Sequence, residues 1–212
     1  MQPRWLHKAY RAWMLHHLAD PHFAFLYDPP PIGEWVTLDC ETTGLNASRD
    51  QIISIGAVRI VGNRLLTSER LELLVRPERA LNAESIRVHR LRESDVAQGM
   101  SPEQAMRQLL EFVGSRPLVG YFLEFDVAML NREIWPLLGV RLPQPKIEVS
   151  AMYYDFKNRQ LPPHQRGGTI DLRFATMMSQ LDLPLRSAHD ALNDAVMAGL
   201  AFIKLRSLLA GR

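Results

Sequence analysis

Two acidic residues, Asp39 and Glu41, stand two positions apart at the end of a short apolar run that begins at Trp35. The run is typical of a buried central strand. Successive side chains of a strand point to opposite faces, so both carboxylates would project from one face and Cys40 from the other. Alone, such a pair is more often a solvated turn. Two adjacent carboxylates repel each other unless a cation lies between them, so the pair can also form a metal site. Cys40 is expected to be a core residue.

Three further residues could join this pair. Asp126 begins a predicted helix after a short strand, His189 lies in a loop, and Asp194 falls in the first turn of the last predicted helix. Four carboxylates can hold two divalent cations roughly 3.5–4 Å apart, the arrangement used for in-line phosphoryl displacement. Oxygen ligands favour Mg²⁺ or Mn²⁺ over zinc. A nearby histidine can accept a proton from the attacking water. The five residues together therefore predict metal-dependent phosphodiester hydrolysis.

The surrounding pattern predicts the elements that position these residues. Strands are expected at 35–39, 51–61, 64–75, 118–121 and 147–149, and helices at 1–18, 102–113, 125–138, 171–180 and 190–209. Three antiparallel strands followed by strands separated by helices indicate an α/β fold, with a mixed sheet and helices on its faces. Three consecutive prolines, 29–31, form a stiff connector. We therefore expect a helical extension with its connector over residues 1–33 and the main domain over 34–212.

Composition sets the broad class of the protein. With 47% hydrophobic and 23% charged residues, the chain of 212 residues is neither disordered nor fibrous. Its net charge of +2 fits an anionic partner without requiring one. The single cysteine excludes a disulfide within the chain and favours a reducing compartment. Because the sequence also lacks a signal peptide and a membrane-spanning run, we expect a cytoplasmic enzyme with no membrane association. Composition does not predict the oligomeric state.

Three motifs occur in a fixed order. The first is Leu38-Asp39-Cys40-Glu41-Thr42-Thr43-Gly44-Leu45, the second runs from Gly120 to Phe125-Asp126, and the third is His189-x-Ala191-x-x-Asp194. Over residues 34–209 the sequence resembles the DEDDh family of 3′–5′ exonucleases, and in particular the proofreading epsilon subunits of bacterial DNA polymerase III. The resemblance implies a ribonuclease H-like fold with a five-stranded mixed sheet and helices on both faces. It also implies hydrolysis from 3′ ends with release of nucleoside 5′-monophosphates.

The resemblance assigns roles to the five candidate catalytic residues. Asp39 would bridge two divalent cations, Mg²⁺ or Mn²⁺. Glu41 and Asp194 would be the further ligands of the cation on the nucleophile side. Asp126 would serve the other cation, and His189 would be the general base.

The resemblance also implies a substrate pocket. Thr42, Thr43 and Leu45 would line the site of the 3′-terminal nucleotide. Tyr121 and Phe122 stand where the family commonly has His-Asn. Their rings could stack on a base, or Phe122 could simply pack under the following helix.

Substrate and partner stay open at the level of sequence. Single-stranded DNA is the favoured substrate, with an exoribonuclease as the alternative and a non-catalytic, polymerase-associated nucleic-acid-binding subunit as the third reading. The chain stops after its last predicted helix, which favours DNA repair over replicative proofreading. Residues 180–185 resemble a peptide that binds the sliding clamp, although ordinary packing of a helix end explains them too. Basic residues at 86–92 could grip phosphates or form a plain solvated surface. The N-terminal helix could pack through Tyr10 and Trp13, or dock a partner or a second subunit. A DNA polymerase or the sliding clamp could be a partner of the protein.

Overall fold

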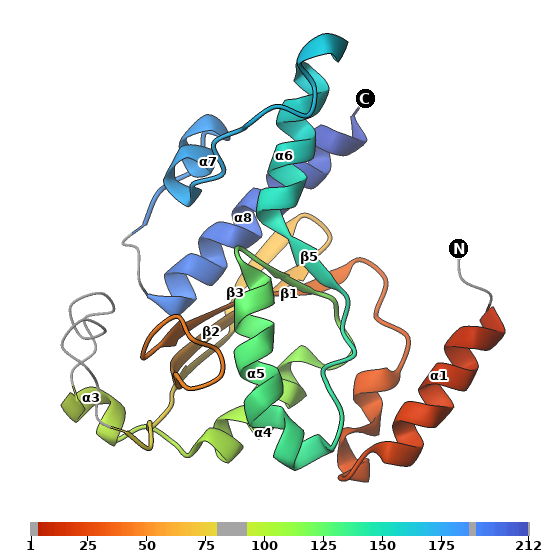
Figure 1. Cartoon of the computed structure of the whole chain (residues 1–212), viewed down its shortest axis with the longest axis vertical. Coiled ribbons are helices and arrows are strands. Elements are labelled where there is room, and N and C mark those ends of the chain that lie inside the picture. Colours follow the sequence, from red (N-terminus) through yellow and green to blue (C-terminus); the bar gives the residue numbers. More distant parts are fainter. Residues whose placement is uncertain (1–3, 80–92, 187–189, 212) are drawn as a thin grey trace.

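A five-stranded sheet forms the centre of the molecule (Figure 1). The computed structural model describes residues 4–79, 93–186 and 190–211. The strand order is β3-β2-β1-β4-β5. The strands are β1 (Glu34–Thr42), β2 (Ile52–Val61), β3 (Arg64–Leu74), β4 (Leu118–Gly120) and β5 (Lys146–Glu148). β1, β2 and β3 pair antiparallel, while β4 is parallel to both β1 and β5. The predicted mixed α/β sheet is therefore confirmed, with β1 at its centre.

Helices cover both faces of this sheet. The described helices are α1 (Arg4–His17), η1 (Pro21–Tyr27), α3 (Glu93–Ala97), α4 (Pro102–Val113), α5 (Leu123–Leu138), α6 (Val149–Gln160), η2 (Pro163–Gln165), α7 (Phe174–Gln180) and α8 (Ala191–Ala210). Buried side chains of α1, η1, α4 and α5 share one core, and those of α6, α7 and α8 share a second. α4 begins where the sequence predicts, because Ser101 and Gln104 form a capping box. α6 was not predicted.

The alternation of side chains along β1 decides what each face carries. Val36, Leu38 and Cys40 belong to the core under α4 and α5, which confirms Cys40 as a core residue. Thr37 points the other way, since its hydroxyl donates a hydrogen bond of 2.7 Å to the carbonyl of Ala195 in α8. Asp39 has the same parity as Thr37 and therefore lies on the α8 side of the sheet.

The N-terminal segment packs into the core beneath α4 and α5. α1 gives way to η1 at Asp20, whose carboxylate accepts the backbone N–H of His22 at 3.1 Å. The expectation that α1 packs through Tyr10 and Trp13 is wrong, because these side chains are 55% and 56% exposed. Met14 and Leu18, one helical turn apart, are buried instead. The domain boundary at residue 33 stays a prediction. Within the described residues, no helix has the length and apolar character needed to cross a membrane.

Candidate active site

Three carboxylates meet at the C-terminal end of β1. One oxygen atom each from Asp39, Glu41 and Asp194 lies within 4.8 Å of the others. Asp39 is half-buried and Glu41 is only 5% exposed, so the negative charges are largely withdrawn from water. Such crowding is costly unless protons or a cation neutralise it. The expected convergence of the first and third motifs on one strand end is thus present in the structure.

A glycine that the sequence analysis did not single out brings Asp194 to this position. Gly56 of β2 pairs with Asp39 across the sheet. A Cβ at Gly56 would lie 2.3 Å from backbone atoms of Ala191 and Leu192 at the start of α8. Only glycine therefore allows this helix to rest on the sheet beside Asp39. The available signal was a lone glycine inside an apolar strand, which often marks a close backbone approach.

The start of α8 is also fixed by its own hydrogen bonds. Asp190 caps the helix by accepting the backbone N–H of Asn193 at 2.9 Å. One turn later, the bond from Thr37 to the carbonyl of Ala195 ties the helix to β1. Asp194 lies between these two anchors, so its carboxylate is presented by a rigid frame.

Asp126 approaches the same strand end from α5, on the other side of β1. Its Oδ1 accepts the backbone N–H of Cys40 at 3.2 Å, and the residue is 4% exposed. Burial, followed by the negative charges of Glu41 and Glu148, raises the pKa of Asp126 to about 8 against the lowering effect of its backbone hydrogen bonds. Burial, and then Asp126, Asp194 and Glu41, hold the pKa of Asp39 well above its ordinary value. Without cations, the carboxyl groups of Asp39 and Asp126 therefore keep their protons to higher pH than ordinary aspartates do.

The loop between β1 and β2 carries three predicted substrate-binding residues. Thr42 is 4% exposed and its hydroxyl donates to the carbonyl of Gly44 at 2.7 Å. The hydroxyl of Thr43 accepts the backbone N–H of Gln51 at 2.9 Å. Leu45, by contrast, is 88% exposed. Both threonine hydroxyls thus shape the loop, while Leu45 is presented to the solvent.

The two aromatic residues after β4 differ from each other. Tyr121 is half-buried, stacks on Phe174 with ring centroids 4.6 Å apart, and donates its hydroxyl to the carbonyl of Leu172 at 3.0 Å. Phe122 is 67% exposed, so the interpretation that it packs under the helix is wrong. Its backbone has φ +55°, which is unusual for a large side chain. The carboxylate of Glu148 holds this turn by accepting the N–H groups of Phe122 and Leu123 at 3.2 and 2.9 Å.

Two sequence predictions fall on residues without a description. His189, the candidate general base, lies outside the described residues, as does the basic stretch 86–92. The clamp-like peptide 180–185, by contrast, lies within the described residues. Its Gln180 accepts a hydrogen bond of 2.6 Å from the hydroxyl of Tyr153, and its Leu181 is 2% exposed. Leu181 thus packs in the core, as the plainer explanation of this peptide expects, whereas Gln180 is exposed and hydrogen-bonded within the protein.

The sheet order and the carboxylate cluster together are typical of ribonuclease H-like nucleases. The chain belongs to the exonuclease family RNase_T, whose model matches residues 36–202. A "DNA polymerase III subunit epsilon-like protein" of Rhodobacter capsulatus is 30% identical over 182 residues, covering 84% of this chain and 24% of that protein. The DNA polymerase III epsilon subunit of Aquifex aeolicus is 23% identical over 82% of this chain and 80% of its own length.

Solved exonuclease structures share the fold. Escherichia coli exonuclease I bound to single-stranded DNA superposes with a TM-score of 0.69 at 14% identity, covering 85% of this chain and 41% of that one. Exonuclease X with 5′-overhanging duplex DNA gives 0.62 at 21% identity, covering 84% and 93%. The chain spans about a quarter of the R. capsulatus relative and 13% of a PolC-type DNA polymerase III of Thermotoga maritima. The ribonuclease H-like fold and the exonuclease family are confirmed.

Proposed function

We propose that this protein is a 3′–5′ exonuclease that hydrolyses phosphodiester bonds at DNA 3′ ends, preferably of single strands, and releases nucleoside 5′-monophosphates. The observation that carries the proposal is the meeting of Asp39, Glu41 and Asp194 within 4.8 Å, in a chain of the exonuclease family. The names of the relatives support DNA as the substrate, since they are DNA polymerase III subunits and polymerases. Escherichia coli exonuclease I, a solved structure of the same fold, holds single-stranded DNA.

The donor set fits two hard divalent cations. The donors proposed are all carboxylate oxygens, the ligands that Mg²⁺ and Mn²⁺ prefer. Burial, with neighbouring carboxylates, raises the pKa of Asp39 and of Asp126, and bound cations would offset the cost of ionising both groups. Asp39, Glu41 and Asp194 would hold one cation, and Asp39 and Asp126 the other. Bound cations would activate water and stabilise the charge that develops on the phosphate. The sequence places His189 close to Asp194 along the chain, and we assign it the proton of the attacking water.

The residues of the proposed substrate pocket divide into shaping and contacting groups. Thr42 and Thr43 shape the loop after β1, and Tyr121 supports Phe122 through a ring contact of 4.6 Å between centroids. Leu45 and Phe122 are exposed, and each lies four residues along the chain from a proposed cation ligand, Glu41 and Asp126 respectively. An exposed ring can stack on any base, so this pair suits a terminal nucleotide regardless of sequence.

The proposal extends to a partner and a compartment. The polymerase names of the relatives support a DNA polymerase as the partner. The exposed rings of Tyr10 and Trp13 on α1 offer a contact surface for it. The single cysteine supports a reducing compartment such as the cytoplasm.

One experiment tests the activity, its direction and its substrate. Wild type, Asp39→Asn and Asp190→Asn are incubated with single-stranded DNA, recessed duplex DNA and RNA of one sequence, each labelled at the 5′ end, with Mg²⁺, Mn²⁺ or EDTA. We expect a ladder that shortens from the 3′ end, no activity in EDTA, and a rate about 10³-fold lower for Asp39→Asn, because several kcal/mol of transition-state stabilisation is lost. Asp190→Asn is the matched control, since asparagine caps a helix as well as aspartate does.

The other outcomes are equally informative. Internal cuts, or full activity of Asp39→Asn, would contradict the proposed mechanism. Faster degradation of RNA than of DNA would establish the exoribonuclease instead. Wild-type protein that degrades no substrate with either cation would be a non-catalytic nucleic-acid-binding subunit.

A further inference from the structure

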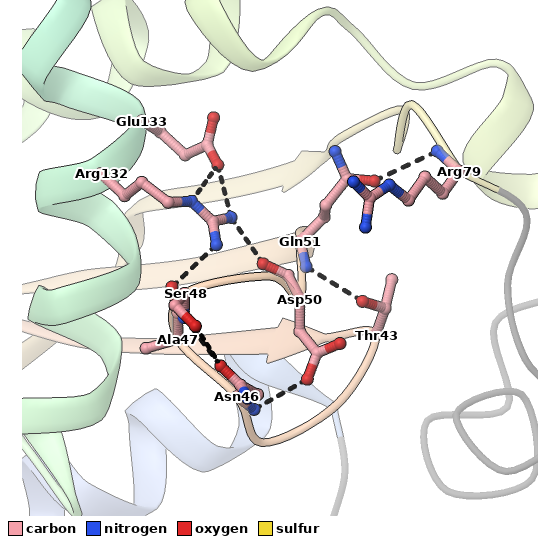
Figure 2. A network of polar contacts seen from close by, with 9 residues as sticks. All are labelled: Thr43, Asn46, Ala47, Ser48, Asp50, Gln51, Arg79, Arg132 and Glu133. Carbon is pink, nitrogen blue, oxygen red and sulfur yellow. Dashed lines mark hydrogen bonds and ion pairs between the residues drawn. The ribbon is translucent and has the colours of Figure 1, made fainter.

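The loop between β1 and β2, residues 43–51, is a closed unit with its own hydrogen bonds; it is called the rim loop below. Its base is fastened twice, by the N–H of Thr43 to the carbonyl of Gln51 and by the N–H of Gln51 to the hydroxyl of Thr43, both at 2.9 Å. Its interior is held by the N–H of Asn46 to Oδ2 of Asp50 at 2.7 Å (Figure 2). These bonds fix the shape of the rim loop. At its base, Oε1 of Gln51 also accepts the backbone N–H of Arg79 at 3.1 Å (Figure 2).

The side chain of Arg132 in α5 reaches across to this loop. Its Nη1 donates to the carbonyl of Ala47 at 2.7 Å and its Nη2 to the carbonyl of Asp50 at 2.5 Å. Glu133 steadies the guanidinium by accepting Nε at 3.2 Å and Nη2 at 2.7 Å, as Figure 2 shows. The acceptors on the loop are backbone carbonyls, so Arg132 holds the path of the chain rather than any particular side chain.

The same helix carries the groups at the other side of the proposed pocket. Phe122 is the N-cap of α5 and Asp126 lies in its first turn. Arg132 follows Asp126 by six residues, a distance of about 9 Å along the helix axis. α5 therefore carries a proposed cation ligand (Asp126), an exposed ring (Phe122) and the arginine that bonds the rim loop (Arg132), all on one rigid element.

We propose that Arg132 is a positioning residue that sets the place of the rim loop, and with it Leu45, relative to α5 and Phe122. This inference rests on the proposed function for its catalytic consequence, because the terminal nucleotide would lie between Leu45 and Phe122. Arg132 itself does not touch the substrate. It acts by keeping the two apolar contacts at a fixed spacing, so its loss weakens the grip on the 3′ end while the carboxylates stay in place.

The geometry explains why arginine is required. Two carbonyls are bound by two separate nitrogens of a planar fork, and a lysine offers only one nitrogen. We expect Arg132→Met and Arg132→Lys each to raise KM for a single-stranded 3′ end about tenfold, the equivalent of one to two lost hydrogen bonds. Their kcat should stay within about threefold of wild type, since Asp39, Glu41 and Asp194 lie on β1 and α8.

Two matched controls separate positioning from charge. Arg11 also donates to a backbone carbonyl, that of Tyr27 at 2.9 Å, and pairs with a carboxylate, Asp28 at 2.8 Å. Arg11→Met therefore removes the same charge and the same kinds of bond from the N-terminal segment, and its KM should equal that of wild type. Glu133→Gln keeps both bonds from Arg132 to the rim loop, so its KM should rise less than threefold.

A second measurement does not depend on activity. Amide hydrogen exchange should become faster over residues 44–50 in Arg132→Met and stay unchanged in Arg11→Met. Unchanged exchange, an unchanged KM, or a fall in kcat without a rise in KM would each overturn the inference. If wild-type protein degraded no 3′ end, the proposed function would fail, and the exchange experiment alone would then decide whether Arg132 holds the loop.

Discussion

The carboxylate cluster and the pair of exposed apolar side chains beside it break opposite rules of folding. Asp39, Glu41 and Asp126 withdraw charge from water, whereas the apolar residues Leu45 and Phe122 are 88% and 67% exposed to it. Buried charge is costly without a counter-charge. Exposed apolar groups that gather beside a candidate site suggest a surface that is covered when it functions. Both regions thus call for a bound group, a cation in one case and a nucleotide in the other.

The two regions also differ in the elements that carry them. The carboxylates project from β1 and from the first turns of α5 and α8, which are anchored by backbone packing at Gly56 and by hydrogen bonds. Leu45 and Phe122 lie on a loop and on a turn. The difference indicates that the proposed metal-binding residues and the proposed substrate-binding residues are supported by separate parts of the fold. Substitutions in the cluster should change metal binding and kcat, whereas those at Leu45 and Phe122 should change KM.

The largest expected effect concerns the cluster without cations. In the folded protein the pKa of Asp126 is raised from 3.8 to about 8, so between these values the folded state holds a proton that the unfolded state has lost. The metal-free protein should therefore lose stability as pH rises from about 4 to about 8. Saturating Mg²⁺ at pH 8 should restore about 3 kcal/mol, a rise in Tm of roughly 5–10 °C for a chain of this size. Thermal unfolding at several pH values, with Mg²⁺ or EDTA, measures the dependence of Tm on pH and the rise in Tm on adding Mg²⁺.

Asp39→Asn sharpens this prediction. The substitution removes the carboxyl group of Asp39, whose pKa is raised by burial and by Asp126, Asp194 and Glu41. The metal-free variant should be more stable than wild type at pH 8, and Mg²⁺ should stabilise it less. A metal-free protein whose stability rises over this pH range would contradict the account of the cluster.

The cluster was more open to sequence reasoning than the apolar pair. The two-residue period of β1 sets the faces of Asp39 and Cys40 locally, and the capping box at Ser101 sets the start of α4 locally. Such signals are complete within a few residues of sequence. They gave every strand and the main helices of the fold except α6, whose buried residues are only Val149 and Tyr153, too few to show a helical period.

Features set by distant contacts could not be predicted in this way. Gly56 is required by the backbone of α8, which lies more than 130 residues further along the chain. The exposure of Phe122 depends on Glu148, which holds the turn from β5. The packing of α1 through Met14 rather than Trp13 depends on the core that later segments of the chain build, to which Met14 belongs while Trp13 is exposed. In each case the partner had to be placed in space before the residue could be interpreted.

The next effect in size concerns the ring of Phe122. Phe122→Ala and Phe122→Gly should each raise KM for single-stranded DNA about tenfold or more, since stacking on one base contributes about 1–3 kcal/mol, and should change kcat little. The two variants should differ in stability. Because φ is +55° at this position, glycine should give a protein about 1 kcal/mol more stable than alanine. Steady-state kinetics and thermal unfolding measure the two differences.

Trp135 provides the control for that prediction. It is also a large aromatic on α5, 54% exposed, but it lies near the opposite end of the helix from Phe122. Trp135→Ala should leave KM unchanged. Equal rises in KM for Phe122→Ala and Trp135→Ala would show that exposed aromatic surface in general, and not the side chain beside the carboxylates, binds the strand.

The smallest effect concerns the hydrogen bond that joins β1 to α8 beneath the cluster. Its removal tests whether the support of the carboxylates can be weakened without a change at Leu45 and Phe122. Thr37 is fully buried and its hydroxyl bonds the carbonyl of Ala195, the residue after Asp194. Thr37→Val keeps the shape of the side chain and removes that bond, so the free energy of unfolding should fall by about 1 kcal/mol. The Mg²⁺ concentration for half-maximal activity should rise about twofold, while KM for DNA stays constant. Thr67→Val, the same change at an exposed position of β3, should alter neither quantity. A rise in KM for Thr37→Val without a change in metal dependence would contradict the separation of the two regions. It would mean that substrate binding depends on the same contact between β1 and α8 that supports the carboxylates.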